Sequence, residues 1–299
     1  MTMWRQVAVV ATLCLALAAP AGAVSVIGAD GERVEIADSA RIVAVGGSLT
    51  EIVYALGVQD RLVAVDTTSR YPEATTALPK VGYLRQLAAE PILALAPGLV
   101  LAEADAGPPT VLGQLREAGV PVLLVPGENS PDGVYAKIET VAAALDLNPA
   151  GAALIADLRV AFATIRAAVA RVKERPRVLF LLSVGGGGAP MAAGADTSAA
   201  SIIALAGGIN AVADYKGYKP ITPEATVGAA PDVILLTERS LGLLGGEDAV
   251  LRIPEIALTP AAEQRRLVAM DGLLLLGFGP RTAAAVGELS RRLHPAMAN

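Results

Sequence analysis

The sequence predicts an α/β protein of two Rossmann-like lobes with mostly parallel sheets, joined by one long helix between the lobes. Three observations predict this class. Short aliphatic runs alternate with helical patterns in the first half of the chain, one long helical pattern follows, and the alternation then resumes. Continuous apolar strands separated by helices are typical of parallel sheets that are covered on both faces.

The chain begins with the pattern of a secretory signal peptide over residues 1–23. A single arginine precedes an apolar run, and the small residues Ala21-Gly22-Ala23 end the segment. The run is too short for a comfortable membrane span, so we expect cleavage after Ala23 and export of a soluble chain. Cleavage removes the only cysteine and the only tryptophan, and the loss of Arg5 changes the formal charge from −5 to −6.

The first α/β lobe is expected over residues 24–146. Its predicted strands are "RIVAV" at 41–45, "LVAV" at 62–65, "LVLA" at 99–102 and "PVLLV" at 121–125. After the first of them, "SLTE" has the pattern of a capping box, with Ser48 as the helix cap and Glu51 reaching back to it. This pattern predicts a helix from Ser48 to Leu56.

A single helix is predicted over residues 147–175. Asn148 is the expected cap, Pro149 suits the first turn, and apolar residues recur at spacings of three and four until Pro176 ends the pattern. At ~1.5 Å per residue this helix would be roughly 35–40 Å long, enough to span both lobes. The second lobe is expected over residues 176–299, with strands "RVLFLL" at 177–182, "DVILLT" at 232–237 and "RLVAM" at 266–270 and a last helix near 282–293.

The two lobes share a short sequence pattern. "EPILALAPGLVLA" begins at Glu90 and "EATVGAAPDVILL" begins at Glu224, and in both a glutamate precedes a proline by seven residues and a buried strand follows. One occurrence per lobe indicates a pseudo-symmetric pair, with the two glutamates at equivalent places.

The composition excludes several kinds of site. The only histidine, His294, lies near the C-terminus, where we expect an exposed, frayed position, so a Ser-His-Asp triad or a histidine-rich metal cage is not predicted. Thiolate chemistry is excluded in a mature chain without cysteine. No basic run suggests nucleic acid. The glycine-rich "VGGGGAP" at 184–190 lacks the spacing of a nucleotide loop, and a flexible loop and a close approach to a flat ligand both remain open.

Oxygen ligands are therefore what remains for a metal, and "VGYLRQLAAEP" at 81–91 places Tyr83 two residues before Arg85. A free phenol titrates near pH ~10, so it ligates well at neutral pH only where a cation stabilises its anion. Ferric iron is such a cation, a guanidinium can add a hydrogen bond, and haem iron held by tyrosine is a known form of ligation. Taken alone, a Tyr-x-Arg tripeptide is a weak signal, and it more often marks a packed tyrosine beside a solvated arginine.

Four longer motifs of the chain resemble those of a known protein family. "VGYLRQLAAEPILALAPGLVLA", "RIVAVGGSLTEIVYALG", "MAAGADTSAASIIALAGGINAV" and "YKGYKPITPEA" resemble periplasmic haem-binding proteins of bacterial haem ABC importers, across nearly the whole mature chain. The resemblance implies a class III binding-protein fold, with two lobes, a rigid helix between them and a ligand cleft. It also implies that the chain is not an enzyme but a receptor, a monomer that delivers haem to a permease dimer in the inner membrane.

Site residues follow from the same resemblance. Tyr83 would be the axial ligand of ferric haem and Arg85 its partner, while Glu90 and Glu224 would dock on arginines of the two permease subunits. Helix-start acids favoured by the helix dipole are the alternative for these two glutamates. Further candidates to line the cleft or meet haem propionates are Arg70, Tyr215, Tyr218, Lys219 and Arg281.

One departure and two alternatives accompany this resemblance. Some family members carry a histidine in the loop that here reads "SVGGGGAPM", so a single five-coordinate haem is expected instead of two. The first alternative keeps the fold and changes the cargo to a ferric siderophore or a cobalamin. The second is an exported hydrolase, which the missing catalytic histidine disfavours, although glycoside chemistry based on carboxylates stays open.

Overall fold

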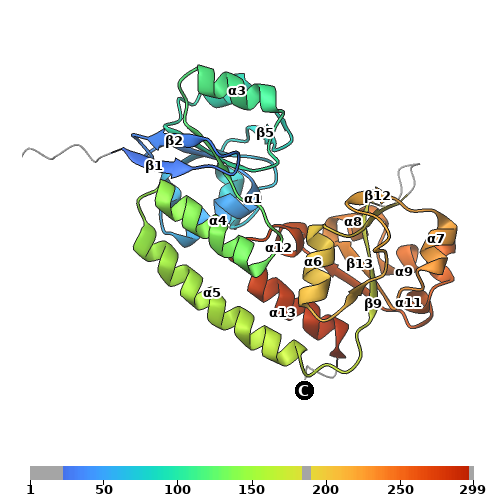
Figure 1. Ribbon diagram of the computed structural model, residues 1–299. Helices are drawn as coiled ribbons and strands as arrows, with labels where there is room; N and C mark the ends of the chain where they lie inside the picture. Colours follow the sequence, from blue (N-terminus) through green and yellow to red (C-terminus); the bar gives the residue numbers. More distant parts are fainter. Residues whose placement is uncertain (1–22, 184–189, 296–299) are drawn as a thin grey trace, which may run out of the picture.

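The computed structural model describes residues 23–183 and 190–295. Residues 1–22 of the predicted signal peptide and most of the glycine-rich stretch lie outside these residues. Two α/β lobes sit side by side, and one long helix, α5, runs along both of them (Figure 1). Within the described ranges, no helix combines the length and the apolar character that a membrane span requires.

The first lobe is built on a four-stranded sheet in the order β4-β3-β7-β8, with all neighbours parallel. Its register pairs Val43 with both Ala64 and Val100, and Val100 with Val122. The strands are β3 (Ile42–Val45), β4 (Leu62–Val65), β7 (Leu99–Glu103) and β8 (Val122–Val125). Two antiparallel hairpins accompany the sheet, β1 (Val24–Ile27) with β2 (Arg33–Ile36) and β5 (Gly82–Tyr83) with β6 (Gln86–Leu87).

Helices cover both faces of this sheet, because successive strand residues are apolar on both sides. Ile42 and Ala44 of β3 pack on one face and Val43 and Val45 on the other. The first face is covered by α1 (Gly47–Ala55) and α4 (Pro131–Ala144), and the second by α2 (Ala89–Leu93) and α3 (Pro109–Glu117). Short 3₁₀ turns lie at Gln59–Arg61 and Glu73–Ala77.

The long helix α5 extends over Asn148–Val169 and packs against α4 and α13. It ends short of the predicted end at residue 175, because "ARVKERP" supplies mainly charged residues and the position before a proline disfavours helix. Turn hydrogen bonds from Arg171 and Val172 close the last turn instead. Asn148 is the first helical residue and not the cap, which is Leu147. The predicted lobe boundaries stay predictions.

The second lobe is built on a sheet in the order β12-β10-β9-β13-β14, with β11 paired to the N-terminal end of β9. The neighbours of β13 are parallel to it, whereas β10 is antiparallel to β9 and β12. The strands are β9 (Arg177–Ser183), β10 (Met191–Ala193), β11 (Ile209–Asn210), β12 (Tyr218–Pro220), β13 (Val233–Thr237) and β14 (Leu267–Met270).

The helices of this lobe are mostly short. They are α6 (Ser198–Leu205), α7 (Pro223–Gly228), α8 (Glu238–Leu243), α9 (Glu247–Leu251), α10 (Pro254–Ala257), α11 (Pro260–Glu263), α12 (Gly272–Leu276) and α13 (Thr282–Leu293). Hydroxyl or carboxylate side chains cap several of them, as Thr197 does for α6 and Asp271 for α12. The last helix, α13, is amphipathic and packs on α5 (Figure 1).

The main strands of the two lobes follow a similar order. The first lobe has β4-β3-β7-β8, and the second, with β11 and β12 set aside, has β10-β9-β13-β14, although β10 is antiparallel to β9. The predicted fold class, two α/β lobes with mostly parallel sheets and a connecting helix, is confirmed.

The apolar core of the chain is continuous between the lobes. One buried cluster contains Leu49 and Ile138 of the first lobe, Phe162 of α5, and Phe180 and Leu289 of the second lobe. Two further clusters are each confined to the outer face of one sheet. The lobes therefore share the core that lies next to α5, and each has a second core of its own.

His294 is buried, and the predicted exposed position is wrong. Its Nε2 lies 3.2 Å from the carbonyl oxygen of Ala206 at the end of α6. The ring fits there because Gly207 has no side chain, since a Cβ at that position would lie 2.9 Å from Nε2. Burial, with smaller contributions from Arg266 and Arg175, lowers the pKa of His294, although hydrogen bonds to the backbone oppose this shift.

The depressed pKa of His294 predicts a pH-dependent stability. His294 binds a proton near pH ~6.5 in the unfolded chain but only at lower pH in the folded chain. Its contribution to the free energy of unfolding is therefore fully present above that pH and is lost as the pH falls below it. His294→Gln should flatten the dependence of Tm on pH between 7.5 and 5. Parallel thermal melts of both proteins across this range measure it, and two profiles of equal slope would contradict the assignment.

Candidate functional site

A large cleft lies between the lobes, at the edges where the parallel strands of both sheets end. In the first lobe it is lined by residues that directly follow β3, β4, β7 and β8, and in the second by residues that follow β13 and β14. Its volume is about 1380 Å³, above the ~300–1,000 Å³ of most small-molecule pockets. Ligands of open α/β sheets bind at this edge of the strands, so the cleft is the candidate site.

The first-lobe wall is organised around the buried carboxylate of Asp66, just after β4. Its Oδ1 accepts hydrogen bonds from the backbone N–H of Gly46 at 3.1 Å and from the hydroxyl of Ser69 at 2.8 Å. Its Oδ2 accepts from the backbone and the hydroxyl of Thr68. One carboxylate thus holds the loops after β3 and β4 together.

Tyr83 and Arg85 are placed by the small hairpin of β5 and β6. Tyr83 pairs with Gln86, and Leu84 and Arg85 form the two-residue turn between the strands. Leu84 is buried in the outer core of the lobe, which anchors the turn. Gly82 has φ +101°, a conformation that side chains rarely adopt, so glycine before the tyrosine is required by the backbone.

The two predicted side chains meet in the cleft. The Arg85 Nη1 donates a hydrogen bond of 2.6 Å to the phenol oxygen of Tyr83, and Tyr83 is 38% exposed. The other terminal nitrogen of Arg85 forms an ion pair with Asp105, in the loop after β7. Partial burial lowers the pKa of Arg85, but Asp105 and Tyr83 together outweigh it and leave that pKa raised, so the guanidinium is a permanent cation.

The second-lobe wall combines apolar and hydroxyl side chains. Leu182 and Leu243 are exposed into the cleft, and Leu243 is 78% exposed. The Tyr218 phenol is hydrogen-bonded to the Ser198 hydroxyl at 3.0 Å, and its ring lies edge-on to Phe180. Of the looser candidates from the sequence, Arg70 and Tyr218 line the cleft. Tyr215 and Lys219 do not: the Lys219 ammonium lies over the ring of Tyr215, 5.4 Å from its centre.

The floor of the cleft contains a buried polar cluster that the sequence did not reveal. Lys137 of α4 donates to the Ser48 hydroxyl at 2.9 Å and lies 3.4 Å from a carboxylate oxygen of Glu103 and from the carbonyl oxygen of Gly277. The Ser48 hydroxyl in turn donates to Glu103 at 2.6 Å. Because Gly277 belongs to the second lobe, this ammonium links the two lobes under the cleft.

A second link between the lobes is the ion pair of Glu51 and Arg281. The guanidinium donates to both carboxylate oxygens of Glu51, at 3.0 Å and 2.6 Å, and stacks on the ring of Tyr71. Burial raises the pKa of the Glu51 carboxyl, while Arg281 opposes this shift. The predicted capping box is therefore wrong. Ser48 and Glu51 have tertiary partners, and α1 begins at Gly47 after the cap Gly46.

The two predicted docking glutamates lie at corresponding places in the lobes. Glu90 is in the first turn of α2 and Glu224 in the first turn of α7, and both side chains are exposed. Each helix is followed by an alanine of positive φ, Ala96 or Ala230, directly before the proline of the repeat. A backbone hydrogen bond and the Thr222 hydroxyl lower the pKa of Glu224, which is thus ionised at neutral pH.

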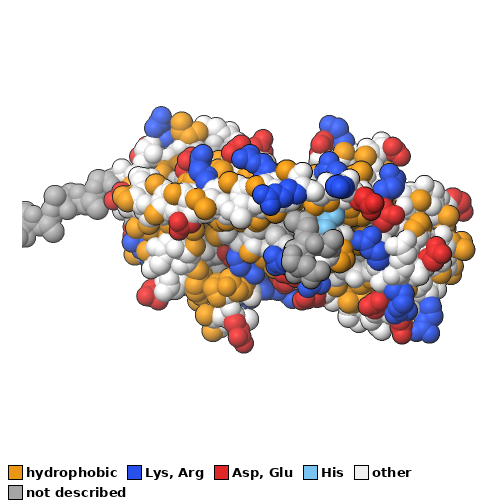
Figure 2. Space-filling view, turned by 90° about the horizontal axis from the view of Figure 1, so that it is seen from below, with side chains coloured by type: hydrophobic (Ala, Val, Ile, Leu, Met, Phe, Trp, Pro, Cys, Tyr) orange, Lys and Arg blue, Asp and Glu red, His pale blue; other side chains and the backbone are white. Residues whose placement is uncertain are grey.

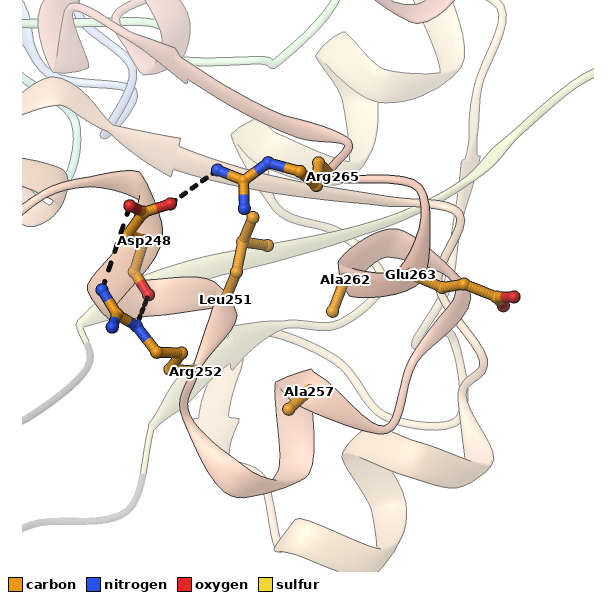
Figure 3. A pocket seen from close by; sticks show the side chains of 7 residues that line it. All are labelled: Asp248, Leu251, Arg252, Ala257, Ala262, Glu263 and Arg265. Carbon is orange, nitrogen blue, oxygen red and sulfur yellow. Dashed lines mark hydrogen bonds and ion pairs between the residues drawn. The ribbon is translucent and has the colours of Figure 1, made fainter.

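Another hollow, of about 400 Å³, lies between α9, α10 and α11 on the second lobe (Figure 3). Asp248 pairs there with Arg265 and with Arg252, all three of them largely exposed. Such surface ion pairs are common and weak, so this hollow is not the candidate site. On one face of the molecule, acidic and basic side chains are interspersed over both lobes (Figure 2). Among the described residues, no group of three or more His, Cys, Asp or Glu side chains could hold a metal ion.

Two lobes with a cleft at their strand ends define a class of binding protein, and a comparison with protein families agrees. A family described as periplasmic binding protein matches residues 42–273. The chain belongs to this family, whose members carry substrates for transport and are not enzymes.

Three individual proteins show how the chain is related to known ones. The solved periplasmic heme-binding protein BhuT, in complex with two hemes, is 45% identical with a TM-score of 0.82, over 86% of this chain and 98% of that one. An uncharacterized ABC transporter substrate-binding lipoprotein, YvrC of Bacillus subtilis, is 28% identical over 85% of this chain and 80% of its own. The vitamin B12-binding protein of Yersinia pestis is 40% identical, but over only 27% of this chain and 29% of its own. Further solved heme-binding proteins have TM-scores of 0.78 to 0.83.

The inter-lobe ion pair predicts a large stability effect. Arg281→Met leaves the buried Glu51 carboxylate without its partner, which typically costs ~3–5 kcal/mol. Urea denaturation should show this loss in the free energy of unfolding. The double variant Glu51→Gln with Arg281→Met should recover part of it, because no buried charge is left unpaired. A single variant as stable as the wild type would contradict the proposed burial of the pair.

Proposed function

We propose that this protein binds ferric haem in the inter-lobe cleft, with Tyr83 as the axial ligand of the iron, and delivers it to an ABC permease of the inner membrane. One observation carries the proposal: an exposed phenol in the cleft receives a hydrogen bond of 2.6 Å from a guanidinium. The similarity to BhuT, which binds haem, supports it over nearly the whole chain.

The chemistry of the pair fits this role. A phenolate is a hard anionic ligand suited to ferric iron, and tyrosine is an established axial ligand of haem. Arg85 would donate its hydrogen bond to the phenolate oxygen, favouring the charged form of the ligand. Leu182 and Leu243 of the opposite wall would pack against the apolar macrocycle, and the cleft volume leaves room for it.

The proposed haem state is a single five-coordinate iron. The described cleft-lining residues include neither histidine nor methionine that could serve as a second strong ligand. BhuT holds two hemes, so titration of the visible spectrum with haem is the measurement that decides the stoichiometry here. We also propose that residues 1–23 are a signal peptide and that the mature protein works in the periplasm as a monomer.

The docking role is proposed for Glu90 and Glu224. They supply one exposed carboxylate per lobe, in the same turn of corresponding helices, and a two-fold permease dimer needs one such group from each lobe. The charge of an acid in the first turn of a helix is also favoured by the helix dipole, so transport measurements are needed to separate the two roles.

A cobalamin is the second candidate cargo, because part of the chain matches a vitamin B12-binding protein. That match covers 82 residues, whereas the match to BhuT covers 86% of the chain. A cobalamin would not need a phenolate beside an arginine. Direct competition between haem and cyanocobalamin for the purified mature chain separates the two cargoes.

Tyr83→Phe is the decisive variant for haem ligation. In the chain of residues 24–299 loaded with ferric haem, it should abolish the phenolate-to-iron charge-transfer absorption and weaken haem retention at least about tenfold, because the Fe–O bond is lost. Visible spectra and the rate of haem transfer to apomyoglobin measure both effects. Tyr71→Phe, outside the cleft lining, is the matched control. Survival of the wild-type spectrum in Tyr83→Phe would refute the ligand assignment.

Reversal of the two glutamates tests docking. Glu90→Lys and Glu224→Lys should leave haem affinity unchanged, since neither residue lines the cleft, and should each reduce haem uptake by the reconstituted importer. The double variant should reduce it further. Glu139→Lys, an exposed glutamate on α4 at the other face of the first sheet, is the control and should have no effect. Unimpaired uptake with both reversals would exclude the docking role.

A further inference from the structure

We propose that Asp105 is a positioning residue for the iron ligand, which holds Arg85 in the orientation that donates a hydrogen bond to Tyr83. The inference rests on the proposed ligation by Tyr83 and extends it to a residue on a different loop. Asp105 lies in the segment after β7 and lines the same cleft.

The geometry is a chain of three side chains. One terminal nitrogen of Arg85 donates to the Tyr83 oxygen at 2.6 Å, and the other is paired with an Asp105 carboxylate oxygen. A guanidinium is planar and presents its N–H groups in a fixed fork. When Asp105 binds one terminal nitrogen of the planar guanidinium, the direction in which the other terminal nitrogen donates is fixed as well.

Arg85 needs such a restraint, because it has little other support. Its side chain is 53% exposed and projects from a two-residue turn. A free arginine samples many rotamers, and fixing one of them costs conformational entropy. Without another partner, the hydrogen bond to Tyr83 would have to offset this cost alone. Asp105, on the far side of the guanidinium, helps to offset it.

The backbone holds the two loops at a fixed separation. The Gly107 N–H donates to the Leu84 carbonyl at 2.9 Å, and the Leu87 N–H donates to the Gly107 carbonyl at 2.9 Å. Leu84 and Ala106 are both buried in the outer core of the lobe. The hairpin that carries Tyr83 and Arg85 is thus fastened to the segment that carries Asp105, and the three side chains stay together.

An exposed ion pair contributes little in water, so the effect of Asp105 should emerge when the cleft is filled. A flat apolar ligand over Tyr83 would displace water from this side of the pair and lower the local dielectric, which strengthens the remaining electrostatic contacts. Asp105 should therefore affect the loaded protein more than the stability of the empty one.

The test uses the mature chain loaded with ferric haem, together with variants of Asp105 and Arg85. Asp105→Ala should speed haem transfer to apomyoglobin about tenfold and shift the ferric-phenolate charge-transfer band, as is typical for loss of a residue that orients a metal ligand. Asp105→Asn keeps an oxygen acceptor and should stay within about twofold of wild type. In an Arg85→Ala background, Asp105→Ala should add nothing further, because Asp105 acts through Arg85. Asp248→Ala removes an exposed carboxylate that is also paired with an arginine but lies outside the cleft, and it is the matched control.

Three results would overturn the inference. They are an unchanged band and transfer rate in Asp105→Ala, a full loss in Asp105→Asn, or an effect of Asp105→Ala that persists without Arg85. Tyr83→Phe separates this inference from the proposed function. If it leaves the band intact, tyrosine ligation itself fails. If it removes the band while Asp105→Ala changes nothing, only the role of Asp105 fails.

Discussion

Parallel strands joined by crossover helices must all end at the same edge of their sheet, and this constraint governs the molecule. Each lobe has its strand ends on the side that faces the other lobe, so the loops that follow β3, β4, β7 and β13 converge on one space. Helices cover both faces of each sheet and leave that edge as the place where polar side chains can gather. The cleft and its polar lining follow from the direction of the strands.

Much of this arrangement could be predicted from the sequence, where the signals are local. Aliphatic runs indicate the parallel strands because both faces of those strands are buried. Tyr83 and Arg85 are two positions apart in one hairpin, so the closeness of their side chains could be inferred from the local sequence. The long helix was predicted from its apolar spacing, although its end was not, because charged residues replace apolar ones before Pro176.

Residues whose partners are distant in the chain could not be predicted. Glu51 and Arg281 are 230 positions apart, and a Ser-x-x-Glu pattern gave the wrong partner for Glu51 because tertiary contacts override local caps. Lys137 is one of several polar residues of α4, and only the fold brings Ser48, Glu103 and Gly277 to it. Asp105 lacks any local pattern that links it to Arg85, and His294 is buried only because Gly207 leaves space for its ring.

The shared core bears on how a bound molecule would leave. The cluster that contains Leu49, Phe162 and Leu289 is continuous between the lobes, so moving the lobes apart would expose apolar surface from both of them. We therefore expect the two lobes to melt in one transition. Release of a cargo from the cleft would then depend on local opening of segments at its edge, such as the hairpin of Tyr83. A membrane partner that bound this edge would change the rate of release without separating the lobes.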